Sequence, residues 1–371
     1  MTSRRMERPR VFVTDGSYSN GLAAVRALAR DGFRVVVGER AGVPLPAAVS
    51  YWSRYCTNRV VYPDPDVDRR ATAAALAETF ERERFDVAIP VGLDMTEIFV
   101  EYRDRLSAPT MLPPTASFEI ASDKRRTFVH AESIGIPVPR TLPLDRWREL
   151  GLPVVFKDPR KGAFVAHTAD AAAAEAARLT AATHVAQAFV PGRNGFGYFG
   201  FFEDGRERAY FLHERLVQFP KEGGASVVAR AIRNERVREL GRRLLESLNW
   251  HGAAMVEFKR SDADGEFYLI EINPKLWGSL DLAIAAGCNF PAWIARSVAG
   301  IPLDLPSEYR SDVRYQWIVP QGLKSFLRYP EFRWQFVRNV FDAGVRSDVK
   351  LLDPLPTVAG LVAMAANAVR R

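Results

Sequence analysis

Apolar residues recur with two different spacings in the first part of the chain, and these spacings predict alternating strands and helices. Short apolar runs that predict buried strands are RVFVTDG (10–16), FRVVVGE (33–39) and FDVAIPVG (85–92). Between them, NGLAAVRALARDG (20–32) and ATAAALAETFERER (71–84) place apolar residues at helical spacing. Strands that alternate with helices in this order predict a parallel sheet.

A turn with two glycines, Gly16 and Gly21, joins the first of these strands to its helix. The glycine spacing of a dinucleotide-binding loop is absent, and no Lys-Ser or Lys-Thr pair follows as in a Walker phosphate loop. Glu39 ends the next strand, where an acid that binds a ribose would lie. We expect a tight structural turn here, with a bound nucleotide as the weaker alternative.

Pro109, Pro113 and Pro114 mark a boundary between two parts of the chain. The elements expected after it are a helix over 116–134, an extended segment over 136–144, a strand over 152–158, a helix over 169–182, a strand over 185–192, and two β-rich stretches separated by a helix over 234–248. Residues 306–371 contain aromatic helical segments and predict a packed C-terminal appendage.

Residues 253–273 predict a β-hairpin that carries carboxylates. The segments AAMVEFK and FYLIEIN flank SDADGE, a cluster typical of turns. Centring the hairpin on Asp264 places Glu257 opposite Glu271 and brings Asn273 to the same face. The other face is apolar and is expected to pack into the core through Val256, Phe258, Ile270 and Ile272.

Two carboxylates that face each other across neighbouring strands repel unless a cation lies between them. Oxygen ligands without a nearby histidine or cysteine indicate Mg²⁺ or Mn²⁺ over zinc, so Glu257, Glu271 and Asn273 are candidate metal ligands. The alternative is a solvated polar face on which lysines, Lys259 among them, serve as counter-ions. The hairpin by itself leaves both interpretations open.

Composition limits the kinds of partner that the chain of 371 residues is expected to have. Residues 1–10 supply +3 of the net charge of +7, and no basic run follows them, so a nucleic-acid partner is not expected. Cys56 and Cys288 are too few for a disulfide scaffold or a structural zinc site, which suits a reducing cytosol. The apolar stretch nearest to membrane length, 357–369, is expected to be a docked helix.

Lysine is rare among the basic residues, since only eight of the 51 are lysine. Lysine presents a compact charge that suits a phosphate oxygen, whereas arginine presents a planar fork. Each lysine is therefore worth considering as a cation of a functional site.

The order of these segments resembles the ATP-grasp superfamily, in its carboxylate–amine ligase branch, which includes carbamoyl-phosphate-synthase-like and biotin-carboxylase-like proteins. The strongest likeness is the carboxylate hairpin followed by EINPKLWGS, which is similar to a family pattern of Glu-x-Asn-x-Arg preceded by a glutamate on the neighbouring strand. SDKRRTF, PVVFK, AQAFVPG and HERLVQFPKEGGAS resemble other family segments in the family's order. The resemblance covers about residues 10–300.

This resemblance implies a multidomain protein of the α/β and α+β classes, in which a Rossmann-like preATP-grasp domain precedes a two-lobed ATP-grasp fold. The implied parts are a disordered basic arm (1–9), the preATP-grasp domain (10–117), a small lobe (118–190), a large lobe with the metal site (191–305) and a C-terminal helical appendage (306–371).

The resemblance also implies roles for individual residues. The implied nucleotide-binding residues are Lys124, Lys157, Lys161, Gln187, Phe189 and Val190. The implied catalytic residues, which would bind the substrate carboxylate and the developing charge, are Lys275, Arg215 and Arg230. The implied metal ligands are Glu257, Glu271 and Asn273.

Three positions depart from the family pattern. Gln187 stands where a glutamate is usual, so a ribose contact there would be uncharged. The loop 157–167 has one glycine, Gly162, where relatives often have several. Lys275 replaces an arginine, which exchanges a bidentate contact for a point charge.

The function implied is an ATP- and Mg²⁺-dependent ligase that forms an amide bond through an acylphosphate and releases ADP and phosphate. The alternatives are a biotin-carboxylase-like enzyme that activates bicarbonate, a non-catalytic nucleotide-binding ATP-grasp protein, and a Rossmann oxidoreductase confined to residues 10–117. The expected cofactors are ATP and Mg²⁺ or Mn²⁺. The expected partners are small carboxylates and amines, amino acids among them, and a second copy in a homodimer, with no nucleic acid, no membrane span and a cytoplasmic location.

Overall fold

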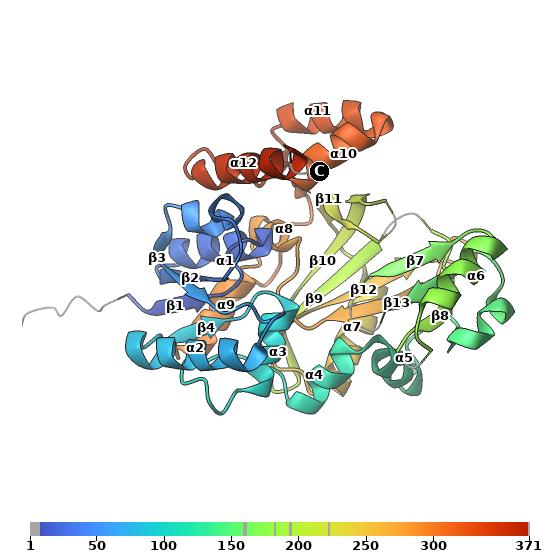
Figure 1. Ribbon diagram of the computed structural model, residues 1–371, viewed down its shortest axis with the longest axis horizontal. Coiled ribbons are helices and arrows are strands. Elements are labelled where there is room, and N and C mark those ends of the chain that lie inside the picture. Colours follow the sequence, from blue (N-terminus) through green and yellow to red (C-terminus); the bar gives the residue numbers. More distant parts are fainter. Residues whose placement is uncertain (1–7, 159–161, 182, 193–194, 222, 370–371) are drawn as a thin grey trace, which may run out of the picture.

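Three β-sheets organise the chain and stand side by side in Figure 1. The computed structural model describes residues 8–158, 162–181, 183–192, 195–221 and 223–369. Most of the expected basic arm, residues 1–7, lies outside the described residues. The mixed α/β and α+β class predicted for the chain is confirmed.

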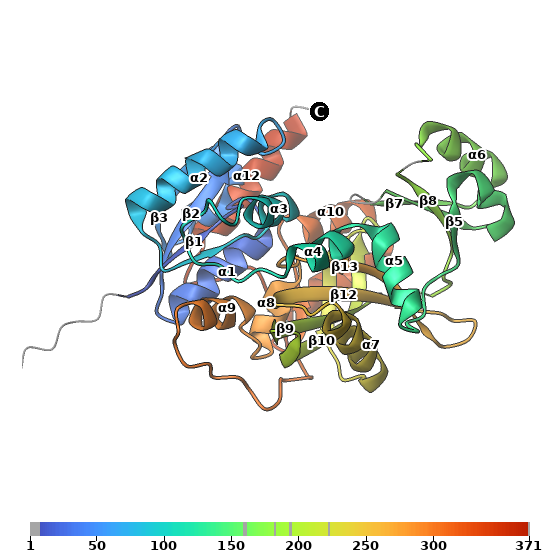
Figure 2. The same ribbon diagram turned by 90° about the horizontal axis from the view of Figure 1, so that it is seen from below.

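The first sheet is parallel, as the spacing of apolar runs predicts, with the strand order β3-β2-β1-β4. Its elements are β1 (Arg10–Val13), α1 (Ser19–Arg30), β2 (Arg34–Arg40), β3 (Cys56–Tyr62), α2 (Arg69–Glu83), β4 (Val87–Ile89) and α3 (Leu93–Glu101). Helix α1 packs on one face of the sheet, and α2 and α3 pack on the other (Figure 2). The structural turn expected after β1 is present, because Glu39 accepts a hydrogen bond from the backbone of Ser17 at 2.5 Å.

The helix predicted over 116–134 is instead two helices, α4 (Thr115–Ser122) and α5 (Lys124–Ser133). Asp123 separates them, and its carboxylate accepts hydrogen bonds from the backbone N–H groups of Arg125 and Arg126. An aspartate in this position satisfies the free N–H groups at the start of a helix. The chain therefore turns at Asp123, and Lys124 becomes the first residue of α5.

A small antiparallel sheet follows, with the order β5-β8-β6-β7. Its strands are β5 (Thr141–Pro143), β6 (Val154–Lys157), β7 (Ala163–Ala166) and β8 (Val185–Ala188), and α6 (Ala169–Arg178) packs against it through Ala172. In Figure 2 this sheet and α6 stand apart from the rest of the molecule on one side.

The largest sheet has seven strands in the order β13-β12-β9-β10-β11-β14-β15. Its strands are β9 (Gly195–Glu203), β10 (Arg206–Phe219), β11 (Ala225–Ala231), β12 (Gly252–Arg260), β13 (Phe267–Asn273), β14 (Arg314–Gln316) and β15 (Val345–Ser347). The helices around it are α7 (Glu235–Ser247), α8 (Leu280–Ala285) and α9 (Phe290–Val298). Buried aromatic side chains, among them Phe199 and Trp277, join the sheet to these helices in the main core.

The pairing of Glu257 with Glu271 predicted for the hairpin is confirmed, but the register changes immediately beyond it. A bulge after Glu257 places Phe258 opposite Leu269, so Ile270 is not the core residue that strict alternation predicts. Leu269 is fully buried instead. A bulge inserts one extra residue into a strand, and that residue shifts the alternation by one position.

Residues 306–371 contribute more than a helical appendage, because β14 and β15 extend the central sheet. The helices of this segment are α10 (Gln321–Arg328), α11 (Arg333–Phe341) and α12 (Leu355–Val369). Strands of three residues carry too little alternation to be recognised from sequence. No helix in the described part of the chain combines the length and the apolarity needed to cross a membrane.

A buried ion pair fastens α12 to the first domain. Arg26 on α1 donates from Nε to Asp353 Oδ2 at 2.8 Å, and both side chains are at most 4% exposed. Asp353 also accepts from Ser53 Oγ and from the backbone N–H of Arg54. A buried carboxylate with three donors has its hydrogen-bonding capacity satisfied, so this contact fixes the C-terminal segment in place.

We predict that Asp353→Ala destabilises the chain by about 3–5 kcal/mol, because it leaves Arg26 buried without a counter-charge. Thermal or urea unfolding followed by circular dichroism measures the change. Asp312→Ala is the matched control, since Asp312 pairs with Arg310 on the open surface and its loss should hardly move the midpoint. Equal midpoints for the two variants would contradict the anchoring role.

Candidate active site

The centre of the candidate site is the carboxylate face of the β12–β13 hairpin. Glu257 lies directly opposite Glu271, and Met255 lies opposite Asn273. Asn273 Nδ2 donates to Glu271 Oε1 at 2.8 Å, which leaves the amide oxygen of Asn273 available on the same face. The three candidate metal ligands are therefore brought together.

Arg215 on β10 supplies the cation beside Glu257. Its guanidinium makes a two-pronged pair with the carboxylate, with N–O distances of 3.0 and 2.9 Å, and its Nε donates to Ser226 Oγ. Strand β9 lies between β10 and β12, so the two side chains meet above it. Gly195 of β9 lies beneath the pair, and a Cβ there would be in ordinary van der Waals contact with the Glu257 carboxylate, at 3.5 Å.

Two lysines from the preceding part of the chain supply cations beside Glu271. The start of α5 brings Lys124 Nζ to 3.3 Å from Glu271 Oε2. Lys157 ends β6, and its Nζ donates to the carbonyl of Ile270 at 3.1 Å. Ile270 is displaced by the bulge after Glu257, and a residue left unpaired by a bulge has a carbonyl free for such a contact.

The charges of this cluster shift the protonation of its members. Burial lowers the pKa of Lys157 to about 7, against the opposite effect of Glu271. Burial would raise the pKa of Glu271, but Lys124, Asn273 and Lys157 together bring it below its usual value. Glu271 is therefore ionised at neutral pH and lies among several basic groups, an arrangement that suits an anionic ligand.

The oxygen donors fit a divalent metal ion of the magnesium type. Two carboxylates and an amide oxygen are hard ligands, and Mg²⁺ commonly takes few protein ligands and completes its shell with water and phosphate. Among the residues that the structure describes, no group of three histidine, cysteine, aspartate or glutamate side chains is placed to hold a metal. A metal here would thus depend on ligands from a bound substrate.

Lys275 follows β13 and faces the first domain. Its enclosed position lowers its pKa, while the carboxylates of Glu271, Asp15 and Asp94 act in the opposite direction. Asp15 follows β1, is buried, and accepts a hydrogen bond from the backbone N–H of Gly92 at 2.7 Å. The carboxyl edge of the parallel sheet therefore closes the site on the side of Lys275.

The residues expected to contact adenine lie at the end of β8 in the small sheet. Gln187 is 2% exposed, and its amide donates to Thr141 Oγ1 at 2.8 Å. Phe189 lies between the two lobes, because Lys259 Nζ of β12 sits 4.4 Å from the centre of its ring. Val190 is buried beside it, and Lys161 lies outside the described residues.

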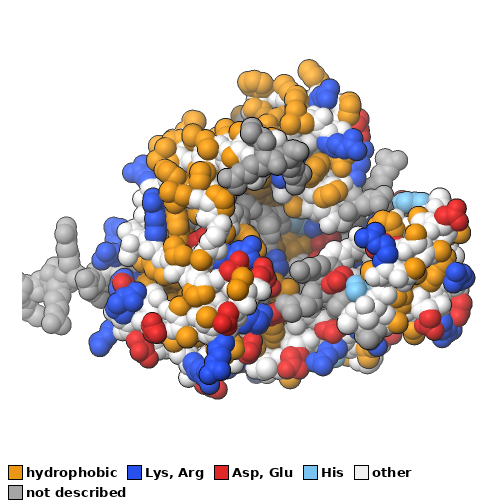
Figure 3. Space-filling view, in the orientation of Figure 1, with side chains coloured by type: hydrophobic (Ala, Val, Ile, Leu, Met, Phe, Trp, Pro, Cys, Tyr) orange, Lys and Arg blue, Asp and Glu red, His pale blue; other side chains and the backbone are white. Residues whose placement is uncertain are grey.

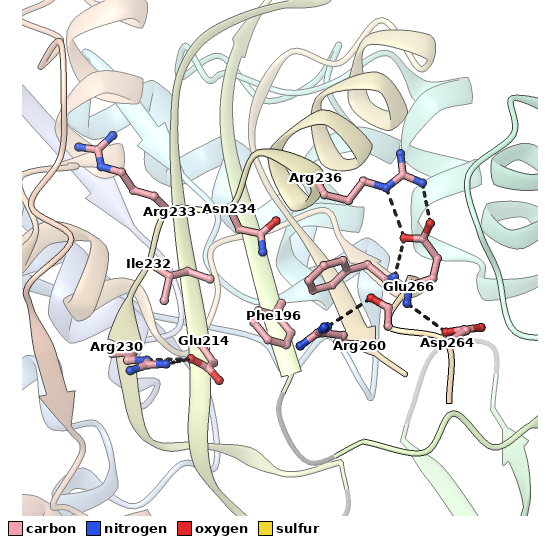
Figure 4. A pocket seen from close by; sticks show the side chains of 12 residues that line it. Phe196, Glu214, Arg230, Ile232, Arg233, Asn234, Arg236, Arg260, Asp264 and Glu266 are labelled. Atoms are coloured by element: carbon pink, nitrogen blue, oxygen red, sulfur yellow. Dashed lines mark hydrogen bonds and ion pairs between the residues drawn. The ribbon is translucent and has the colours of Figure 1, made fainter. Parts of the chain in front are cut away.

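Arg230 is not brought to this cluster. It pairs across β10 and β11 with Glu214, to which its Nε donates at 2.7 Å. Successive side chains of a strand point to opposite faces, so Glu214 and Arg230 lie on the face opposite Arg215. They line a separate pocket of about 650 Å³, which Figure 4 shows from close by.

His213 on β10 is a core residue. It shares a face with Arg215 but is 1% exposed and packs edge-on against Phe199, with ring centres 4.7 Å apart. Burial holds the pKa of its ring well below the usual range, and the positive charge of the nearby Arg215 lowers that pKa further. A neutral, enclosed imidazole does not serve as a general acid or base here.

Sequence reasoning missed three contributors to the site: Gly195, Ser226 and Phe128, whose ring lies 4.9 Å from Lys157 Nζ. The alternation of glycine with aromatic residues in GFGYFG (195–200) was the available signal for Gly195. A glycine inside a strand often marks a place where another group approaches the backbone closely.

A family model described as "ATP-grasp in the biosynthetic pathway with Ter operon" matches residues 214–320 of the chain. This segment includes the carboxylate hairpin. A search of curated proteins by sequence found no match.

Solved structures with a similar fold extend the likeness over most of the chain. They include biotin carboxylase from Campylobacter jejuni (TM-score 0.64, 14% identity, 84% of this chain and 75% of that one). L-amino acid ligase from Bacillus licheniformis is similar to the chain (TM-score 0.62, 17% identity, 80% and 75%). So is N5-carboxyaminoimidazole ribonucleotide synthetase from Thermotoga maritima (TM-score 0.59, 18% identity, 81% and 78%).

The family match at the hairpin and the fold match over the sheets agree with the resemblance found in the sequence. Residues 214–320 thus match an ATP-grasp family model, and the chain shares the fold of these solved structures.

Proposed function

We propose that the chain is an ATP- and Mg²⁺-dependent ligase that joins a carboxylate to an amine and releases ADP and phosphate. The observation that carries this proposal is the facing pair Glu257 and Glu271, surrounded by cations from three different segments. Phosphoryl transfer depends mainly on positioning and on neutralising charge, and this cluster offers both. The similarity to an L-amino acid ligase of known structure supports the same class of reaction.

In this proposal Glu257, Glu271 and Asn273 hold Mg²⁺ or Mn²⁺, which neutralises negative charge on the phosphates of ATP when it is bound. Lys124 and Lys157 bind the phosphates directly. Both lysines already lie beside Glu271 or its strand, so they are fixed before the nucleotide arrives. Groups fixed in advance need little reorganisation during the reaction.

Adenine would lie between the two lobes, against Phe189 and Val190 and near Gln187. The Gln187 amide donates to Thr141, which orients its carbonyl oxygen, a neutral acceptor, in place of the usual carboxylate. Phe189 offers a ring face, and Lys259 already occupies one side of that ring. The nucleotide base would therefore contact the backbone of β8 and the free side of the aromatic ring.

The substrate carboxylate would lie next to Arg215 or Lys275, on the same face as the carboxylate pair. One of its oxygens attacks the γ-phosphorus, the bond to the β-phosphate oxygen breaks, and ADP leaves. The amine then attacks the acyl carbon, loses a proton, and displaces phosphate to form the amide. Both steps develop negative charge on oxygen, which Arg215 and Lys275 are placed to stabilise.

We predict that Glu271→Gln lowers Mg²⁺-dependent ADP release by about 100-fold or more, because it removes one of the two charges proposed to hold the metal. A coupled assay of ADP release over panels of carboxylates and amino acids measures the effect. Arg230→Gln is the matched control on the opposite face of the sheet and should change turnover little. Wild-type turnover by Glu271→Gln with an intact fold would contradict the metal assignment.

The same panel separates a ligase from a protein that binds ATP without catalysis. If the wild-type chain binds ATP and Mg²⁺ by calorimetry but releases ADP with none of the acid and amine pairs, the non-catalytic alternative is favoured.

A bicarbonate-activating enzyme is the second candidate, because biotin carboxylase is among the structures with a similar fold. For a carboxylate–amine ligase we predict ADP release that needs the organic acid and is unchanged when bicarbonate is removed. Degassed buffers with and without added bicarbonate, each with and without acid, measure the dependence. An absolute requirement for bicarbonate would overturn the ligase proposal.

We predict that Lys157 makes the stability of the chain rise with pH between about 7 and 10. Its pKa in the folded chain is about 7, against an ordinary value near 10.4 in the unfolded chain. Over this range the unfolded state binds more protons, so raising the pH favours the folded state, by at most about 1.4 kcal/mol per pH unit.

Melting temperatures of the wild-type chain and Lys157→Met across this pH range test that prediction, and the difference between them should grow in favour of the wild type as pH rises. The exposed Lys324→Met serves as control and should follow the wild-type curve. Parallel curves for the wild type and Lys157→Met would show that Lys157 does not titrate in this range.

A further inference from the structure

Exposed large apolar side chains are concentrated in one segment of the chain. Of the eighteen such side chains in the described residues, eleven lie within residues 327–362. They are Leu327, Trp334, Val337, Val340, Phe341, Leu351, Leu352, Leu355, Val358, Leu361 and Val362. We call these side chains the C-terminal apolar surface.

Helix α11 presents apolar residues on both of its faces. Phe332, just before the helix, and Phe336 pack against β11 in a small core. Trp334 and Phe341 point away from that core and are 75% and 84% exposed. Aromatic side chains of this size rarely remain in water on a surface that contacts nothing.

Helix α12 also contributes to the C-terminal apolar surface. It has no charged residue between 355 and 369, and it packs on the first domain around Val49–Trp52 with Ala359 buried. Its outer face exposes Val358, Leu361 and Val362. Figure 3 shows hydrophobic side chains gathered over α11 and α12 at the top of the molecule.

Basic residues flank this apolar surface. Lys324, Arg328, Arg338 and Arg346 are exposed, and none of them forms an ion pair with a residue that the structure describes. The acidic residues of the same segment are Glu331, which pairs with Lys221, the exposed Asp342, and Asp348 and Asp353, which accept backbone or buried hydrogen bonds. The exposed surface therefore has a net positive charge.

We propose that the C-terminal apolar surface binds the surface of an anionic lipid bilayer. Aromatic and aliphatic side chains that insert at the headgroup level, ringed by lysine and arginine, are typical of proteins that lie on a membrane without spanning it. A second copy of the chain docked on the same surface would bring the four unpaired cations toward each other. An anionic bilayer attracts those cations instead, and each of them raises the affinity of the chain for the bilayer by about fivefold.

Sedimentation with vesicles tests this proposal on the full chain. Vesicles of phosphatidylcholine alone are compared with vesicles of equal parts phosphatidylcholine and phosphatidylglycerol. The chain is expected to sediment with the anionic vesicles, to bind the neutral ones at least tenfold more weakly, and to lose binding as salt is raised.

Variants assign the binding to this surface. Trp334→Ser combined with Phe341→Ser should reduce binding tenfold or more, and Arg328→Gln combined with Arg338→Gln should reduce binding to the anionic vesicles by about 25-fold. The controls are Val67→Ser, an apolar side chain that is 84% exposed in the first domain, and the exposed Arg70→Gln. Unchanged melting temperatures establish that the variants fold.

Three results would overturn the proposal. One is a chain that stays in the supernatant with both kinds of vesicle. Another is vesicle binding that the surface variants do not reduce. The third is a dimer in light scattering that Trp334→Ser with Phe341→Ser dissociates while vesicle binding is absent, which would assign the surface to a second copy.

Discussion

The opposition of Glu257 and Glu271 across two neighbouring strands is the constraint that the rest of the site satisfies. Two carboxylates at this separation are stable together only when cations lie beside them. The cations come from Arg215 on β10, Lys124 at the start of α5 and Lys157 at the end of β6. The small lobe (118–190) and the large lobe (191–305) are thus joined electrostatically at one place. Because basic groups outnumber the two carboxylates, the same place remains attractive to an anion, and a nucleotide triphosphate with its metal is one that fits.

The face of the sheet on which a charged side chain lies, more than the kind of residue, decides whether it belongs to the candidate site. Arg215 and Glu214 are neighbours in sequence, yet one reaches Glu257 across β9 and the other pairs with Arg230 on the opposite face. The first contact passes above Gly195 of β9, whereas the second is direct because β10 and β11 are adjacent. Strand order and register therefore determine which site an arginine belongs to. The identity of the residue alone does not reveal either of them.

Local periodicity and turn chemistry predicted the parallel first sheet and the pairing of the two glutamates, and the resemblance to a family implied the fold class. The bulge that moves Ile270 out of the core has no signature in simple alternation. Asp123 is a residue type that commonly caps helices, but the sequence prediction places it inside a single helix. Contacts between distant segments, such as that between Arg215 and Glu257, depend on the order of strands in the sheet. That order was available only through the resemblance to a family.

The C-terminal segment combines a fixed attachment with an outer surface that the fold itself does not use. Arg26 and Asp353 form a buried, fully hydrogen-bonded pair at the base of α12, so the helix is held against the first domain. A loosely attached tail could expose apolar residues because it samples many conformations, but a segment anchored in this way exposes them in a defined arrangement. The apolar outer face of α12 is thus a property of the folded protein. It belongs to the packing of α12 on the first domain, where Ala359 is buried, and not to a separate flexible tail.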